Sequence, residues 1–323
     1  MALPSVLKGR LRIPVIGSPL FIVSGPELVI AQCKAGIVGS FPALNARPEP
    51  VLDEWLERIT AELDAHQKAN PDAIVAPYAV NQICHTSNDR LEHDVMACVR
   101  HKVPIVITSL RAPVEVVQEI QSYGGIVIHD VINMRHARRA IKDGVNGLVP
   151  VCSGAGGHAG TLSPFALVSE MRAEFGDEIC IALSGAIGNG ASVLGALSMG
   201  ADVAYIGSRF IASEEANADP GYKQMLVDSS ASDIVYSSLF TGVHGNYLSG
   251  SISNAGLDPQ NLPEGSKSDM NFGSGGNTEK KAWKDIWGSG QGIAGIEKVQ
   301  PIAEIVDALE QQYHSARERV LAA

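Results

Sequence analysis

The 323-residue sequence predicts an α/β fold, a (β/α)8 TIM barrel with a smaller inserted second domain or cap. Short segments rich in Val and Ile recur before residue 210, and they are apolar throughout, which is typical of parallel strands covered on both faces. A doubly wound sheet usually needs fewer strands and a glycine fingerprint, and the first turn, GSPLFIVSG, has no GxGxxG. The eight predicted strands lie within residues 14–19, 36–43, 74–81, 103–110, 124–132, 147–154, 179–187 and 201–208.

The segments between these strands predict helices, as a βα repeat requires. In residues 113–122, Pro113 takes the first helical position, and Val114, Val117 and Ile120 form one apolar stripe. Residues 135–143 predict a second helix that ends at Gly144, a natural C-terminal cap.

The repeat stops after residue 209. Residues 213–285 contain no strand–helix repeat, and residues 250–278 are rich in Gly, Ser, Asn and Asp, which predicts loops. We therefore expect a barrel built from residues 1–212 and 286–323, with residues 213–285 inserted as a cap on the substrate side. A closing helix is predicted over residues 299–321, with one face made of Ile302, Ile305, Val306 and Leu309.

Charge and composition indicate the class of partner. The net charge of -10 and the lack of any run dense in Lys and Arg argue against nucleic acid. No segment reaches eighteen consecutive apolar residues, so no membrane span is predicted. The five cysteines never form a CxxC spacing, which fits reduced thiols better than a disulfide frame or a zinc site. We expect a cytoplasmic protein that binds a small molecule, and a homodimer is one assembly compatible with this sequence.

Glycine-rich turns follow the seventh and eighth predicted strands, where barrels of this type commonly hold a phosphate. The first is LSGAIGNGAS, with Gly185, Gly188 and Gly190, and the second is YIGSRF, with Gly207 and Ser208. Small residues let backbone N–H groups approach a phosphate closely. Each cluster alone is typical of an ordinary tight turn, but the pair at these strand ends predicts a phosphate site.

The loop after the sixth strand, VCSGAGGHAG, combines four glycines with His158. Its bare backbone allows a flat ligand to approach, and His158 is placed to take a proton near neutral pH or to donate to a developing anion. An isolated histidine is more often structural, whereas one in a glycine-rich loop at the carboxyl end of a barrel strand favours function. His129, at the end of the fifth strand, could equally point into the barrel mouth or pack internally. No histidine has a metal-ligand spacing, and no GxSxG or Walker A motif is present.

Four motifs together resemble the flavin-dependent nitronate monooxygenase family. They are GAGGHAGT, SGAI, MGADVAYIGSRF and WGSGQGIAGI, and the resemblance spans about residues 14–300. It implies an FMN-binding barrel with a smaller second domain, which uses O2 to oxidise alkyl nitronates to a carbonyl compound and nitrite. Neutral nitroalkanes are a further implied substrate if the enzyme removes their α proton.

The same resemblance implies roles for particular residues. His158 would be the catalytic base or a polar contact near the flavin, and Gly156 and Gly157 would be the backbone that the ring approaches. Residues implied to bind the cofactor elsewhere are Pro19 and Leu20 in the first-strand loop, Asn81 at the end of the third strand, Gly185 and Ala186, Ile206, Gly207 and Ser208, and, in a late flavin-side motif, Gln291.

The sequence departs from the family pattern in the loops that meet the ring. Many members carry an acidic residue before AGGH and a Gln nearby, where this chain has Gly154 and Val151, and Ala186 replaces a usual glycine. Because backbone contacts dominate phosphate recognition, FMN binding should survive these changes. Polar contacts to the ring, and with them substrate choice, are left open.

Three alternatives are compatible with the same pattern. An NAD(P)H-dependent quinone or enoyl-thioester reductase would use the same flavin barrel, a non-catalytic module would bind flavin or phosphate only, and a phosphosugar isomerase or aldolase would bind no flavin. Within the inserted segment, residues 235–248 are expected either to cover the flavin, with contacts from Tyr236, His244 or Tyr247, or simply to pack against the barrel.

Overall fold

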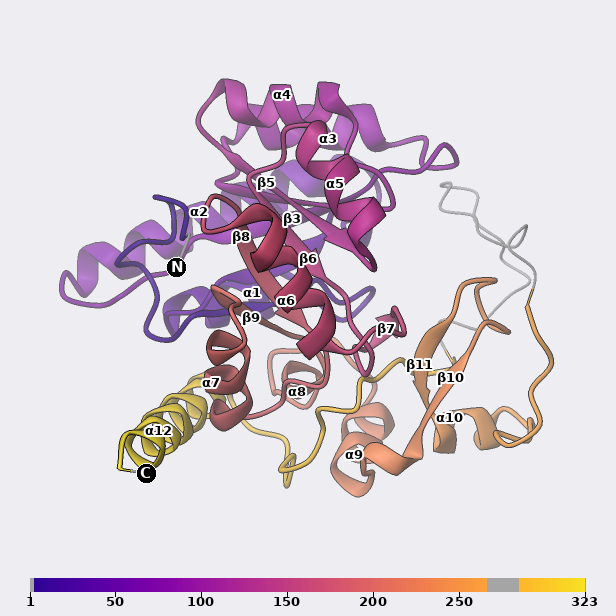
Figure 1. Ribbon diagram of the computed structural model, residues 1–323. Coiled ribbons are helices and arrows are strands. Elements are labelled where there is room, and N and C mark those ends of the chain that lie inside the picture. The colour runs from indigo at the N-terminus through magenta and orange to yellow at the C-terminus, as the bar shows by residue number, and fades with distance from the viewer. Residues whose placement is uncertain (1–2, 266–284, 323) are drawn as a thin grey trace.

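A computed structural model describes residues 3–265 and 285–322 of the chain (Figure 1). Within these residues, eight strands form one sheet in which every neighbouring pair is parallel, which confirms the predicted barrel class. Seven of the eight predicted segments contain one of its strands, and the third, residues 74–81, contains the first four residues of β3. The strands are β1 (Val15–Gly17), β2 (Gly39–Pro42), β3 (Tyr78–Ile83), β4 (Ile105–Ser109), β5 (Ile126–Val131), β6 (Gly147–Pro150), β8 (Cys180–Ser184) and β9 (Val203–Ile206).

The sheet closes on itself almost completely. Its order is β1-β9-β8-β6-β5-β4-β3-β2, so the first and second strands of the chain lie at its two edges. A parallel bridge between Ile16 and Val38 joins these edges, with hydrogen bonds from Gly17 N to Val38 O (2.8 Å) and from Val38 N to Val15 O (3.1 Å). Closure leaves few unpaired edge groups and gathers all carboxyl strand ends at one mouth.

Helices surround the barrel and connect successive strands (Figure 1). Proline occupies the first helical turn of α1 and α6, where its missing N–H costs no helical hydrogen bond. The helices are α1 (Pro26–Lys34), α2 (Val51–Ala69), α3 (Leu91–Arg100), α4 (Val114–Ser122), α5 (Met134–Lys142), α6 (Pro164–Phe175), α7 (Gly190–Ser198), α8 (Ser208–Ile211), α9 (Pro220–Asp228), α10 (Ser249–Asn254) and α12 (Ile302–Leu321), with 3-10 turns at Ala43–Asn45 and Ala231–Asp233. No helix of the described residues is long and apolar enough to cross a membrane.

The predicted helices are present, with small differences at their ends. Pro113 is the N-cap of α4 and not its first helical residue, so the buried face consists of Val116, Val117 and Ile120 while Val114 is exposed. The prediction that Val114 belongs to the buried face of this helix was therefore wrong, and Val116 takes its place. The closing helix α12 starts after Pro301, and its predicted face from Ile302 to Leu309 is buried as expected.

Two apolar clusters lie on the two faces of the barrel strands. The outer cluster joins the strands to the helices, and the inner cluster fills the barrel with residues such as Ile16, Ile105, Ile128 and Val203. Leu7, which is buried, and other apolar residues of the N-terminal segment pack against the inner cluster. The barrel is thus a packed core whose chemistry must take place at a rim.

Residues 213–265 add a small unit beside the barrel, drawn in orange in Figure 1. Strands β10 (Ile234–Ser237) and β11 (Gly245–Leu248) form an antiparallel hairpin, and β11 also pairs with β7 (Gly157–His158), which belongs to the loop after β6. Phe240, Tyr247, Ile252 and Ile286 form the separate core of this unit. The hairpin is therefore joined by backbone hydrogen bonds to the loop that carries the predicted catalytic histidine.

Candidate functional site at the barrel mouth

The two predicted phosphate turns are adjacent because β8 and β9 are neighbours in the sheet. Gly185 has a φ of 157° and Ala186 a φ of 52°, a left-handed conformation that favours glycine. At Gly207, an added Cβ would lie 2.6 Å from Ser18 Oγ and 3.3 Å from the Leu20 side chain. A side chain there would have to displace Ser18 and Leu20, so the chain after β1, which carries Pro19 and Leu20, lies directly against the turn after β9.

The loop after β6 packs against the turn that follows β9. A Cβ added at Gly156 would lie 2.7 Å from Gly290 N and 3.2 Å from Ser208 Oγ. Gly157 has a φ of 66°, and a Cβ placed on it would meet nothing within 4 Å. A side chain at Gly156 would collide with its neighbours, so glycine allows the loop to pack closely there. The space beside Gly157 is open, which would allow a flat ligand to approach its backbone.

A late segment of the chain completes the mouth. Gly290 N donates to Ser208 Oγ (2.8 Å), and Gln291 N donates to Gly154 O (2.8 Å). A Cβ at Gly292 would lie 2.6 Å from the carbonyl carbon of Ala186. Gln291, which the sequence links to the flavin side, therefore lies beside both the phosphate turns and the histidine loop.

Polar side chains form the inner layer of the mouth above the apolar filling of the barrel. Asn81, which is buried, donates from Nδ2 to Ser109 Oγ (2.8 Å), and Ser109 hydrogen-bonds to Asp130. Burial raises the pKa of Asp130, and it raises that of Tyr205, the next inward residue across the mouth. Asn81 was predicted from the sequence, whereas Ser109, Asp130 and Tyr205 were not. Asp130 could have been found from the alternation of side chains along β5, because it lies two positions after Ile128, which points into the barrel.

The same alternation assigns His129 to the opposite face of β5. Its ring is buried and its Nδ1 lies 2.9 Å from Thr108 Oγ1 on the neighbouring strand. Of the two roles left open for His129, the structure supports internal packing between strands and helices.

His158 lies on β7 and faces the hairpin. Its backbone pairs with Gly245 of β11, and its Nε2 lies 2.9 Å from Thr241 Oγ1 in the turn between β10 and β11. Burial lowers the pKa of His158 to about 4, so the ring is neutral at pH 7 and does not titrate near neutrality as the sequence alone suggests. A neutral imidazole carries a lone pair that can accept a proton or a hydrogen bond, and the lowered pKa makes this ring a weaker base than an ordinary histidine.

The three hairpin residues considered as substrate contacts have different environments. Tyr247 is fully buried, and its ring packs edge-on against Phe240 with centroids 4.9 Å apart, so it is a core residue. Tyr236 is 41% exposed and stacks on His244 at 4.9 Å, while its hydroxyl donates to Ala159 O (2.8 Å). The exposed Tyr236–His244 stack next to the histidine loop is the part of the hairpin available to a ligand.

Several exposed apolar side chains lie in the segments that follow barrel strands at their carboxyl ends, in the first turns of the next helices, or on β10. A ligand bound at the mouth could cover some of them. The set comprises Phe21, Ile22, Leu110, Val114, Ile132, Leu162, Phe165 and Tyr236.

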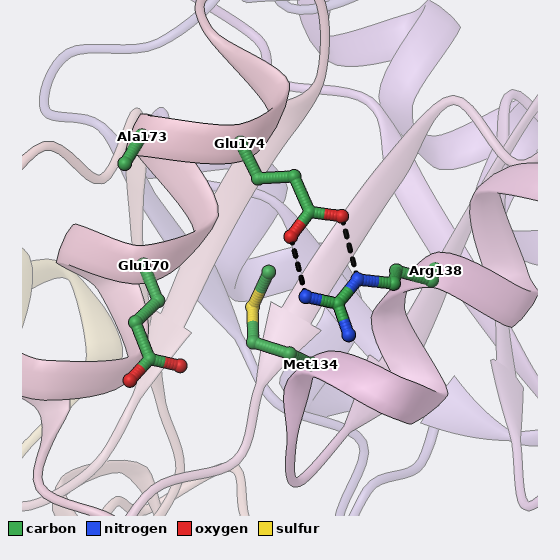
Figure 2. Close-up of a pocket in the computed structure, with 5 residues that line it drawn as sticks. All are labelled: Met134, Arg138, Glu170, Ala173 and Glu174. Atoms are coloured by element: carbon green, nitrogen blue, oxygen red, sulfur yellow. Dashed lines mark hydrogen bonds and ion pairs between the residues drawn. The ribbon is translucent and has the colours of Figure 1, made fainter.

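A pocket on the outer helical layer has a different character. It lies between α5 and α6 and is lined by Met134, Arg138, Glu170, Ala173 and Glu174 (Figure 2). Arg138 donates two hydrogen bonds to Glu174, each 2.6 Å long, so its charge is already paired. This pocket belongs to the helix surface, and the mouth of the barrel remains the candidate site.

Comparison with known proteins identifies the family to which the chain belongs. A family description named nitronate monooxygenase matches residues 7–312. A nitronate monooxygenase of Paraburkholderia phytofirmans is 26% identical over 95% of this chain and 94% of its own length. The structure of nitroalkane oxidase from Streptomyces ansochromogenes is similar with a TM-score of 0.78 at 18% identity, covering 98% of this chain and 100% of that one. FabK from Thermotoga maritima gives 0.75 at 21% identity, covering 98% and 97%. These two structures share the barrel fold.

Proposed function

Because the chain belongs to the nitronate monooxygenase family, a family of oxidoreductases, we propose that it oxidises alkyl nitronates with O2 to carbonyl compounds and nitrite, with FMN as its cofactor. The observation that carries this proposal is the position of His158, on a strand whose neighbour Gly157 borders open space, beside the paired turns after β8 and β9.

The residues at the mouth fit FMN. The turns at Gly185–Ala186 and Gly207–Ser208 would hold the phosphate through backbone N–H groups, and the crowding around Gly207 explains why a small residue is needed. Gly156 and Gly157, with Asn81 from the polar layer, would border the ring. When bound, FMN supplies the transfer of electrons from substrate to O2.

The protein's own contribution is orientation and proton transfer. His158, neutral because of burial, would accept the α proton of a neutral nitroalkane or hydrogen-bond to a bound nitronate. The hairpin of residues 234–248 positions this ring through the pairing of β7 with β11. We propose that residues 213–285, of which 266–284 lie outside the described residues, act as a cap on the substrate side, with the Tyr236–His244 stack contacting substrate.

Two measurements test the proposal. The purified protein should show the visible spectrum of oxidised flavin, release FMN on denaturation, and produce nitrite from nitronates in the presence of O2. Gly207→Val should lower flavin occupancy, because its branched side chain would collide with Ser18 and Leu20. Release of FAD, or a colourless protein that binds no FMN, would contradict the cofactor assignment.

The role of His158 is tested with both forms of the substrate. His158→Asn should reduce turnover of neutral nitroalkanes by about a hundredfold or more with flavin still bound, since this is the scale lost with a positioned proton acceptor. Nitronates, already deprotonated, should lose less. Equal losses on the two forms would argue against proton abstraction.

A reductase acting on quinones or enoyl thioesters is the competing activity on the same barrel. Anaerobic mixing with NADH separates the two, because rapid bleaching of the flavin by NADH, without nitrite formation from nitronates in air, would support the reductase.

A further inference from the structure

A polar floor closes the barrel mouth above the apolar inner cluster. Inward-facing side chains recur at every second residue along a strand. On β4, β5 and β9, the inward positions directly beyond the inner cluster are Ser109, Asp130 and Tyr205. All three are half-buried, and because the inner cluster fills the barrel beneath them, their accessible surface faces the mouth. Asp130 and Tyr205, here called the floor pair, are the titratable members of these three.

Hydrogen bonds hold the Asp130 carboxyl at the end of β5. Asn81 Nδ2 donates to Ser109 Oγ (2.8 Å), so the Ser109 hydroxyl can use its own proton to donate to Asp130. A backbone hydrogen bond from Leu110 reaches the same carboxyl. The position of this carboxyl is therefore set by its contacts with β4 and the residue that follows it.

The surroundings of the floor pair favour the neutral form of both groups. Burial raises the pKa of Asp130 and of Tyr205, and the charge of Asp130 raises that of Tyr205 further, which places the two groups near each other across the mouth. His129, on the other face of β5, most strongly opposes the shift at Asp130, but burial lowers the pKa of His129 and leaves it neutral at pH 7. The other titratable neighbours of Asp130 are Cys84, whose pKa burial raises to about 12, and His136 on α5. A ring that covers the floor would remove the remaining water and favour the neutral forms further.

We propose that the floor pair binds a carbonyl oxygen of the flavin ring, with the neutral carboxyl of Asp130 and the phenol of Tyr205 each donating one hydrogen bond to it. This inference rests on the proposed function for the identity of the ligand, and it assigns contacts to the ring that the phosphate turns do not make. Each group has one proton to donate, and a carbonyl oxygen has two lone pairs, so both donors can be satisfied at one oxygen.

The position of Tyr205 favours the ring over the substrate as the ligand of the floor pair. Tyr205 precedes Gly207 of the turn after β9 by two residues, so a phosphate held at that turn brings the attached ring close to it. The hairpin proposed to contact the substrate lies beside the barrel (Figure 1). A ring oxygen above two neutral donors gains both hydrogen bonds in a site shielded from water, where they are stronger. An ionised Asp130 would instead repel that oxygen.

The first test measures the Kd of FMN for the full-length protein by equilibrium dialysis, without turnover. Asp130→Leu and Tyr205→Phe should each raise this Kd by about 5- to 100-fold, the cost of leaving a buried acceptor without its partner. Asp130→Asn keeps an N–H donor at nearly constant shape and should stay within about twofold of the unmodified protein. The matched controls are Asp72→Asn, on an exposed turn, and Tyr313→Phe, on α12, and neither should change the Kd.

The second test reads the protonation state of Asp130 directly. Infrared spectra of the FMN-loaded protein at pH 7 should contain the C=O band of a protonated carboxyl, which Asp130→Asn removes and Asp72→Asn leaves in place. Absence of this band would overturn the inference, as would Asp130→Leu binding FMN as tightly as the unmodified protein. A changed KM for nitronate at unchanged Kd for FMN would also overturn it, because the floor pair would then contact the substrate.

Failure of the proposed function has a different signature. If the protein binds FMN and the floor-pair variants raise the Kd as expected, but no nitrite forms from nitronates in air, the proposed reaction is wrong and the ring contact stands. A protein that binds no FMN would overturn the ring contact together with the cofactor assignment.

Discussion

Ala186 occupies a backbone conformation that suits glycine, in the turn that we assign to the phosphate. Its φ of 52° brings Cβ close to the following carbonyl oxygen, which costs about 1–2 kcal/mol for a residue other than glycine. We predict that Ala186→Gly raises the free energy of unfolding by about 1 kcal/mol, measured by denaturant titration at equal flavin loading. Ala182→Gly, in the buried strand β8 that precedes this turn, is the control and should destabilise. A loss of stability in Ala186→Gly would show that the turn is not strained.

His158 links the stability of the protein to pH. A pKa lowered from 6.5 to about 4 means that the unfolded chain takes up a proton between these values while the folded chain does not. Stability should therefore fall by about 3 kcal/mol from this residue as pH drops from about 7 to about 4, and the residue contributes little slope above about pH 7.5. His158→Asn should flatten the curve of unfolding free energy in this window. The control His314→Asn, on exposed α12 surface, should keep it, and an unchanged slope in His158→Asn would contradict the assignment.

Residues of the candidate site could be proposed from the sequence where a motif points to them, and they were hidden where only the folded geometry selects them. The glycines near β6, β8 and β9 stand out in the sequence because bare backbone is rare in such density. Asp130 and Thr241 do not, because an acidic residue at a strand end and a threonine in a turn are ordinary until the sheet register and the hairpin pairing bring them to the mouth. The lowered pKa of His158 was equally hidden, because it depends on burial by residues distant in the chain.

At the scale of elements, α7 and α12 meet at a contact that tolerates no side chain. A Cβ at Gly190 would lie 2.1 Å from Leu309 O and 2.3 Å from Tyr313 N, both backbone atoms of α12. Gly190→Ala should therefore destabilise the protein by about 1–3 kcal/mol, the usual cost of overpacking, as measured by thermal or denaturant unfolding.

The same helix provides the control for this prediction. Gly195 is exposed, and an added Cβ there would meet nothing within 4 Å. Gly195→Ala should stabilise by about 0.5–1 kcal/mol through helix propensity alone. Equal effects of the two substitutions would argue that α12 does not pack on α7 this closely.

The strands of the barrel were predictable because the apolar pattern seen in the sequence is what buries them in the fold. A strand buried on both faces must be apolar throughout, and the eight segments show this directly. The hairpin of β10 and β11 lacked that signature, since Ser237, Gly245 and Asn246 interrupt it. Strand β11 pairs with β7 across nearly ninety residues of chain, and a contact at that separation leaves no signal in the local sequence pattern.

At the scale of the whole molecule, stability and chemistry are placed at opposite ends of the barrel. Leu7, 3% exposed, belongs to the N-terminal segment that packs against the inner cluster. Leu7→Ala should lower the unfolding free energy by about 2–5 kcal/mol while leaving kcat for nitronate within about twofold. Leu321→Ala, on a side chain that is 75% exposed, should cost less than about 0.5 kcal/mol. A large fall in kcat for Leu7→Ala in folded protein would show that the two ends are coupled.

The late segment at the mouth has a consequence for the order in which the protein acquires its cofactor. Gly290 reaches back 82 residues to Ser208, and Gln291 reaches further still to Gly154. Contacts between residues so far apart form after local ones, because the chain between them must first be ordered. A nascent chain that has emerged from the ribosome only as far as residue 285 would contain all eight barrel strands and still lack one wall of the mouth. Flavin capture should therefore follow barrel formation during synthesis, and it should report that the last part of the chain has folded into place.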